Sequence, residues 1–255
     1  MNKQLLRIYL LFVKYFRTYD EAAYLAYQAE QFSSLGLDFE AAKNHIKLIY
    51  KDYSFVNDAM ASEHHTLFSA VSLRGSVSRI LEIGTFNGKN AALLSLLFPD
   101  AEIVTVDLDD NDALFKDSYN RADQTARDIF IKERNALLGQ FGNIKFLQMN
   151  SLALGGFIAE SFDMVWVDGA HGYPVIAIDI ANSLRLLKND GLLLCDDVFI
   201  SAGKDDPMYR SRAGFETLTA FHQAALIVFN LIYKRTAFPN CLPPLLKYIA
   251  VVRKT

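Results

Sequence analysis

The chain has 255 residues, of which 51% are hydrophobic and 22% are charged, with only 13 glycines and 6 prolines. This composition is typical of a packed globular protein and argues against extended disorder. Its formal net charge of −3 gives no general positive field, so we expect no nucleic acid partner.

Residues 1–75 are predicted to be helical throughout, because apolar side chains recur every three or four positions and no proline interrupts them. We interpret this stretch as an N-terminal cap or arm. Its first segment, MNKQLLRIYLLFVKYF, contains basic residues and is too short and too interrupted to span a membrane. The segment could contact a membrane surface weakly as an amphipathic helix, although packing on the core or on a second subunit of a homodimer is favoured.

From residue 76 to residue 255 the pattern predicts an α/β domain. Five apolar runs end in polar residues, as expected of strands buried on both faces of a parallel sheet: RILEI, EIVTVDL, NIKFLQM, FDMVWVD and GLLLCDD. Helical stretches cover residues 88–98, 113–142 and 174–190, and this alternation predicts right-handed βαβ units. Two further strands within residues 224–238 and 246–254 have no helix between them, so we expect an antiparallel pair at one sheet edge. The expected fold is Rossmann-like, a seven-stranded, mostly parallel sheet in three αβα layers.

The two cysteines, Cys195 and Cys241, have no metal-binding spacing, and Cys195 falls inside an apolar strand. A reducing compartment fits this usage, and we therefore expect a cytoplasmic protein.

The loop after the first strand, in RILEIGTFNGKN, is the expected ligand site of an open parallel sheet. Its glycines, Gly84 and Gly88, have the wrong spacing for a P-loop, and Phe86 breaks the dinucleotide fingerprint. What remains is an acid on each side of the loop, Glu82 before it and Asp107 at the end of the second strand. Carboxylates accept hydrogen bonds from ammonium groups and ribose hydroxyls, so a nucleoside that carries a cation is indicated.

These residues resemble the cofactor-binding motif of the class I S-adenosylmethionine-dependent methyltransferases. The resemblance covers residues 78–199 and implies S-adenosyl-L-methionine as cofactor. It places Glu82 near the amino-acid end of the cofactor, Asp107 on the ribose, and Asn150 with Ser151 at the adenine. The expected cofactor contacts are Glu82, Gly84, Thr85, Phe86, Asn87, Gly88, Asp107, Leu108, Asn150, Ser151 and Asp168.

Three more carboxylates follow the fourth and fifth strands: Asp168 in VDGAHG, and Asp196 and Asp197 in LCDDVF. Adjacent parallel strands would bring them to one rim, where uncompensated negative charge repels itself. A divalent cation such as Mg²⁺ would relieve this repulsion, and we expect Asp168, Asp196 and Asp197 as its ligands. The alternative is that Asp196 or Asp197 caps a helix or binds loop amides.

VDGAH and CDDV resemble the cation-dependent O-methyltransferases of the catechol and macrocin types. His171, three residues after Asp168, stands where the catechol type has a lysine, and this departure favours the sugar-modifying branch. We expect His171 to act as the general base beside Asp168, unless it only orients its loop.

The expected function is O-methylation of a small polyhydroxylated acceptor, such as a sugar, a nucleotide-sugar or a natural product, assisted by a divalent metal. Two alternatives stay open: a non-catalytic binding module with this fold, and an aminopropyl-type transferase that uses the same pocket. A polar stretch at residues 199–215, with Lys204, Arg210 and Arg212, is either a substrate lid or a solvated loop.

Overall fold

The computed structural model describes residues 21–50, 62–75, 77–118, 121–200, 211–234 and 247–255. Within the described residues, three helices precede the sheet: α2 (Glu21–Ser34), α3 (Phe39–Ile49) and α4 (Ser62–Ser72). The helical prediction is thus correct for these parts of the N-terminal stretch. The predicted first helix, with its membrane or dimer contact, lies outside the described residues.

Seven strands form one mixed sheet, in the order β3-β2-β1-β4-β5-β7-β6. Their bounds are β1 (Arg79–Ile83), β2 (Glu102–Asp107), β3 (Ile144–Gln148), β4 (Phe162–Val167), β5 (Leu187–Phe199), β6 (Ile227–Lys234) and β7 (Lys247–Lys254). Strands β1 to β5 pair in parallel, and β7 pairs antiparallel with both β5 and β6. The predicted Rossmann-like sheet with an antiparallel edge pair is confirmed, and order reverses between β1 and β4.

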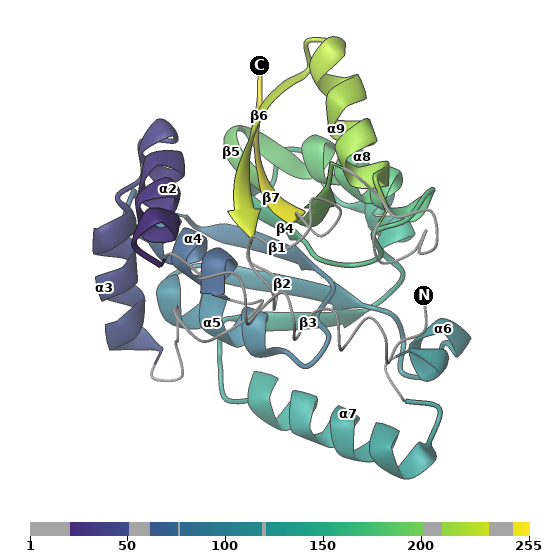
Figure 1. Cartoon of the computed structure of the whole chain (residues 1–255). Coiled ribbons are helices and arrows are strands. Elements are labelled where there is room, and N and C mark those ends of the chain that lie inside the picture. The colour runs from purple at the N-terminus through teal and green to yellow at the C-terminus, as the bar shows by residue number, and fades with distance from the viewer. Residues whose placement is uncertain (1–20, 51–61, 76, 119–120, 201–210, 235–246) are drawn as a thin grey trace, which may run out of the picture.

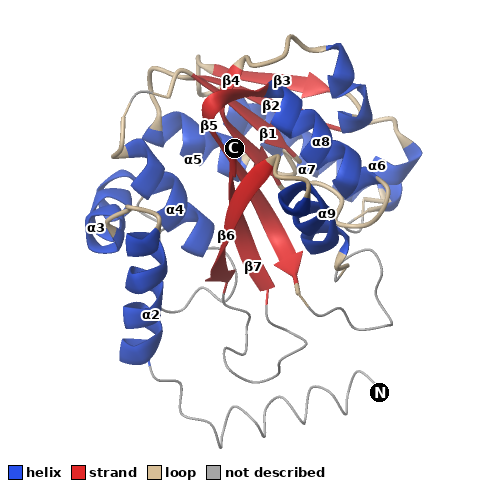
Figure 2. Cartoon of the chain, turned by 90° about the horizontal axis from the view of Figure 1, so that it is seen from above, coloured by secondary structure: helices blue, strands red, loops and turns tan. Residues whose placement is uncertain are grey.

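Helices cover both faces of this sheet (Figures 1 and 2). The N-terminal helices and α5 (Lys89–Leu97) pack on one face, with α7 (Gln124–Leu138) beside α5. The 3₁₀ helix η1 (Ser151–Gly156), α8 (Val175–Leu186) and α9 (Ala213–Gln223) pack on the other face. The predicted long helix over residues 113–142 is instead split into α6 (Ala113–Asp117) and α7, each of which begins after an aspartate that caps it, Asp112 and Asp123.

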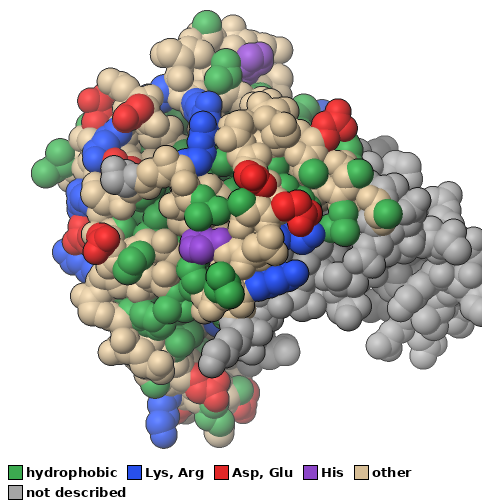
Figure 3. Space-filling model, turned by 90° about the vertical axis from the view of Figure 1, so that its left-hand side faces the viewer, with side chains coloured by type: hydrophobic (Ala, Val, Ile, Leu, Met, Phe, Trp, Pro, Cys, Tyr) green, Lys and Arg blue, Asp and Glu red, His purple; other side chains and the backbone are tan. Residues whose placement is uncertain are grey.

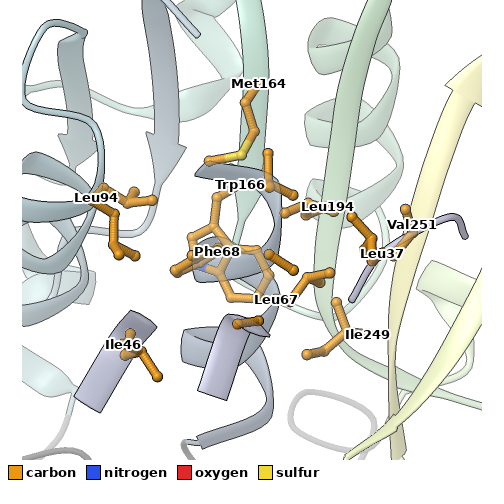
Figure 4. Packing of buried hydrophobic residues seen from close by; sticks show 14 of the residues in the cluster. Leu37, Ile46, Leu67, Phe68, Leu94, Met164, Trp166, Leu194, Ile249 and Val251 are labelled. Carbon is orange, nitrogen blue, oxygen red and sulfur yellow. The ribbon is translucent and has the colours of Figure 1, made fainter. Parts of the chain in front are cut away.

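The strands alternate between the two faces. On the α4 side, Trp166 lies at the centre of an apolar cluster and its ring meets Phe68 edge-on, with ring centroids 4.9 Å apart (Figure 4). The neighbouring residues Val165 and Val167 point to the α8 side. This alternation decides which side chains at the strand ends share a face, and therefore which can meet in one site.

The surface that carries α2 and α3 bears both signs of charge. Figure 3 shows Lys and Arg side chains interspersed with Asp and Glu on this side of the molecule, with hydrophobic side chains scattered between them. A mixed surface of this kind gives no single-sign field on the face shown. No helix among the described residues is both long and apolar enough to cross a membrane.

Candidate functional site

The loops after β1 and β4 meet at the point where strand order reverses. The amide of Asp168, directly after β4, donates to the carbonyl of Ile83 at the end of β1 (2.8 Å). The amide of Gly84 donates in turn to the carbonyl of Val106 in β2 (2.9 Å). These bonds hold the first residues of the two loops at the carboxyl ends of the strands, where open α/β sheets bind their ligands.

Both glycines of the first loop have backbone angles that favour glycine. Gly84 has φ +101°, and a β-carbon there would lie 2.2 Å from the carbonyl oxygen of Asp168. Gly88 has φ +78° and is the N-cap of α5. A β-carbon on Gly88 would lie 2.8 Å from the Leu138 side chain. Between them Phe86 also has a positive φ of 47°. The sequence G-T-F-N-G therefore forms a tight turn that no bulkier pair of residues could reproduce without strain.

Asp107 fixes this turn from the end of β2. Its Oδ2 accepts a hydrogen bond from the Phe86 amide and its Oδ1 one from the Leu108 amide, each at 2.8 Å. Each oxygen keeps further acceptor capacity, because a carboxylate oxygen has more than one lone pair. Within the turn, the Asn87 side chain accepts from the Lys89 amide (3.1 Å). Asp107 thus organises the loop and still presents an acid at the rim. Its predicted contact with ribose stays a prediction.

Glu82 lies beneath the loop and is completely buried. Thr105 donates its hydroxyl to Glu82 Oε2 (2.5 Å), so the Thr85 hydroxyl, 2.6 Å from Thr105, donates to Thr105. Burial raises the pKa of Glu82 to about 8, although the Thr105 hydrogen bond opposes this shift. The carboxyl therefore supports the loop from below through Thr105 and Thr85. Its predicted contact with the cofactor stays a prediction.

Asn150 follows β3 and caps η1. Its Oδ1 accepts from the Leu152 amide (3.0 Å), and Ser151 is the first residue of that 3₁₀ turn. The amide oxygen that we expected to accept a bond from adenine therefore already holds a backbone amide, with one lone pair left. Both residues lie after β3, which β2 and β1 separate from β4.

Asp168 and His171 lie together in the loop after β4, with His171 Nε2 4.0 Å from Asp168 Oδ1. Burial raises the pKa of Asp168 well above its usual range, and the Asp196 carboxylate raises it further. Burial lowers the pKa of His171, although Asp197 and Asp196 pull it in the opposite direction. A neutral imidazole beside a carboxyl group is the state that a general base requires.

Two lysines bind the carboxylates at the end of β5. Lys234 Nζ donates to Asp196 Oδ2 (2.5 Å) and to Asp197 Oδ1 (3.3 Å), and Lys247 Nζ donates to Asp197 Oδ1 (2.7 Å). Burial alone would lower the pKa of Lys234, but Asp196 and Asp197 raise it above the usual lysine value. Burial likewise would raise the pKa of Asp196, but Lys234 and Lys247 bring it below the usual value. Both partners are therefore charged at neutral pH.

The predicted metal site at Asp168, Asp196 and Asp197 is not supported by this arrangement. The neutralising charge that we assigned to a divalent cation is already present as two ammonium groups. No cluster of three or more His, Cys, Asp or Glu side chains in the described part of the chain is placed to hold a metal ion. The donor set at the β5 end therefore does not fit a divalent metal.

The sequence interpretation missed these lysines, although a signal was present. Lys234 ends one strand of the antiparallel edge pair and Lys247 begins the other, and the two are register partners. Because β7 runs antiparallel to β5, its start lies at the carboxyl end of β5. A lysine at the end of one strand and another at the start of the next would therefore have been expected at the same rim as the carboxylates.

His64 on α4 is buried, and its ring stacks on Trp166, with ring centroids 5.5 Å apart. Its Nε2 contacts Asn90 Oδ1 at 3.1 Å, which joins α4 to the start of α5. Of the three basic residues in the predicted lid, Lys204 and Arg210 lie outside the described residues, and Arg212 pairs with Glu216 at 3.6 Å.

The family model and the similar solved structures named below are all methyltransferases. Residues 81–198 match a family model described as a methyltransferase domain. The chain is similar in structure to the O-methyltransferase TomG from Streptomyces achromogenes, which is involved in tomaymycin synthesis and was solved in complex with SAM. The sequence identity is 19%, the match covers 100% of this chain and 99% of that chain, and the TM-score is 0.51. It is also similar to the Bacillus cereus O-methyltransferase in complex with SAH, with 12% identity, coverage of 90% and 97%, and a TM-score of 0.56. An SAH-bound methyltransferase from Podospora anserina has 17% identity, coverage of 94% and 98%, and a TM-score of 0.54. A search of curated proteins gave no match.

Proposed function

We propose that this methyltransferase, which has the class I fold and a methyltransferase domain at residues 81–198, transfers the methyl group of S-adenosylmethionine to an oxygen of a small polyhydroxylated acceptor. One observation carries the proposal: the glycine turn, Asp107 and Asp168 converge at the strand-order reversal between β1 and β4. The similar solved proteins that are O-methyltransferases with SAM or SAH bound support it.

The residues at this rim fit a nucleoside that carries positive charge. Asp107 offers carboxylate oxygens toward ribose hydroxyls, and Asp168 offers a carboxyl group whose ionised form a bound ammonium or sulfonium group would favour. The turn from Gly84 to Gly88 has no long side chain at either glycine, so a ligand can approach its backbone closely. In this proposal Asn150 and Ser151 meet the adenine from the end of β3.

The chemistry follows from the loop after β4. S-adenosylmethionine supplies a methyl group bonded to positively charged sulfur. His171 Nε2 accepts the proton of the acceptor hydroxyl, and the oxygen forms a bond to the methyl carbon while the carbon–sulfur bond breaks and its electron pair stays on sulfur. No covalent intermediate with the chain is needed, so most of the rate enhancement comes from positioning the two reactants.

We also propose that residues 1–75 are a helical cap on a methyltransferase domain at residues 76–255. Two contacts of the described helices support this division. His64 and Phe68 of α4 pack on Trp166 of β4, and α4 lies against α5. The cap therefore contributes to the face of the sheet that carries Glu82 and Trp166.

Calorimetric titration with S-adenosylhomocysteine tests the proposed cofactor site. The wild type should bind, and Asp107→Ala should weaken binding at least about tenfold, because hydrogen bonds to a charged group are worth roughly 1.5–3 kcal/mol. Asp100→Ala is the matched control, since Asp100 is an exposed aspartate that precedes the opposite end of the same strand. Absence of binding by the wild type, or equal losses in the two variants, would contradict the proposal.

A further inference from the structure

The carboxylates at the end of β5 are bound by cations from within the chain. Lys234 and Lys247 are register partners at the end of the β6–β7 pair where β6 ends and β7 begins. Their side chains are only 5% and 8% exposed, so neither ammonium group is a solvated surface charge. In a folded protein, buried ammonium groups of this kind persist only where carboxylates bind them.

A local irregularity in β5 makes this pairing possible. Adjacent side chains of a regular strand point to opposite faces, so Asp196 and Asp197 would normally point apart. The register with β7 shifts between Cys195 and Val198, and Asp197 has a φ of 49°. This bulge turns both carboxylates toward the same lysine, which binds Asp196 at 2.5 Å and Asp197 at 3.3 Å.

The lysine–carboxylate pairs disfavour the binding of a divalent ion electrostatically. With every group ionised, Asp168, Asp196 and Asp197 carry three negative charges and the two lysines two positive charges, so the cluster keeps a single negative charge. An incoming divalent ion would have to displace the lysines from Asp196 Oδ2 and Asp197 Oδ1 and would be repelled by them at short range.

We propose that Lys234 and Lys247 are the permanent cations of this site, so that the chain does not take up a divalent metal and works without one. The exclusion of a metal does not depend on the proposed function. Its consequence for the acceptor does rest on that function. A metal-assisted transferase holds its acceptor through two neighbouring oxygens that chelate the ion. Here Lys234 supplies a positive charge near His171 without chelation, so an acceptor with a single hydroxyl group suffices.

Titration of the full chain with Mn²⁺, followed by electron paramagnetic resonance, tests the inference directly. The wild type should show no specific binding at millimolar Mn²⁺. Lys247→Met and Lys234→Met should each bind Mn²⁺ at least about tenfold more tightly than the wild type, because each removes a nearby positive charge and frees carboxylate oxygens. Lys254→Met, at the far end of β7, is the matched control and should behave like the wild type.

Two results would overturn the inference. The first is specific Mn²⁺ binding by the wild type that Asp196→Asn abolishes. The second is the lack of Mn²⁺ binding by a lysine variant that remains folded, since the lysines would then not be what excludes the ion. Should Lys234→Met fail to fold, the wild type and Lys247→Met still decide the question. Calorimetry with S-adenosylhomocysteine on the same samples separates the two proposals, because loss of the proposed cofactor site would abolish nucleoside binding and leave the Mn²⁺ results unchanged.

Discussion

The carbonyl oxygen of Asp168 lies 2.2 Å from the point that a β-carbon on Gly84 would occupy. The first glycine of the β1 loop and the acid that follows β4 are thus in direct backbone contact across the strand-order reversal. Two residues that are far apart in sequence form one structural unit, and the geometry of the glycine turn sets the position of Asp168 and of His171 beyond it.

Gly84→Ala should therefore disrupt both stability and cofactor binding. The new methyl group would meet backbone atoms, which cannot rotate away, and the positive φ of 101° adds strain. We expect a loss of roughly 3 kcal/mol or more in the free energy of unfolding, measured by urea denaturation. Gly156→Ala is the control, because nothing lies within 4 Å of its added β-carbon. A tolerated Gly84→Ala would show that the two loops separate easily.

The parallel strands and the glycine turn could be predicted because each depends on a local pattern. Apolar runs indicated five parallel strands, and the spacing of Gly84 and Gly88 indicated a turn with an acid at either side. The burial of Glu82 could not be predicted in the same way, since it depends on Thr105 from a neighbouring strand. The lysine pair depends on a bulge at Asp197 and on the register of the β6–β7 pair, neither of which a single run of residues reveals.

Glu82 should make the stability of the protein fall as pH rises. Its pKa is raised by burial from 4.5 to about 8, so its contribution to stability is complete below pH 4.5 and is lost as pH rises through about 8. The loss over this interval should be on the order of 4 kcal/mol. Urea denaturation of the wild type and of Glu82→Gln at several pH values measures it, because the amide does not titrate.

The difference between these two proteins isolates Glu82. Asp107 and Asp168, the other acids that interact with it, are present in both. The wild type should lose stability relative to Glu82→Gln between pH 5 and pH 8.5. Parallel stability curves would mean that the Glu82 carboxyl does not hold its proton in the folded state.

His171→Ala should separate catalysis from cofactor binding. A general base contributes about 10²–10⁴-fold to the rate, so turnover should fall by that order while the affinity for S-adenosylhomocysteine changes little. Turnover is measured with the hydroxylated small molecule that a panel of acceptors identifies. The control is His222→Ala, an exposed histidine on α9 whose ring contacts the carbonyl of Ile227 at 3.0 Å. Equal losses of turnover and affinity would make His171 a residue that only shapes its loop.

The Lys234–Asp196 pair should show strong coupling in folding stability. Lys234→Met leaves the buried Asp196 carboxylate without its lysine and Asp197 with Lys247 alone, and removing one member of a buried pair typically costs about 3–5 kcal/mol. Adding Asp196→Asn should recover part of that loss, because the unpaired negative charge disappears with it. A double-mutant cycle of unfolding free energies measures the coupling. If the two losses simply add, the 2.5 Å contact contributes no net stability, and the lysine is then held at the rim by the fold of the β6–β7 pair alone.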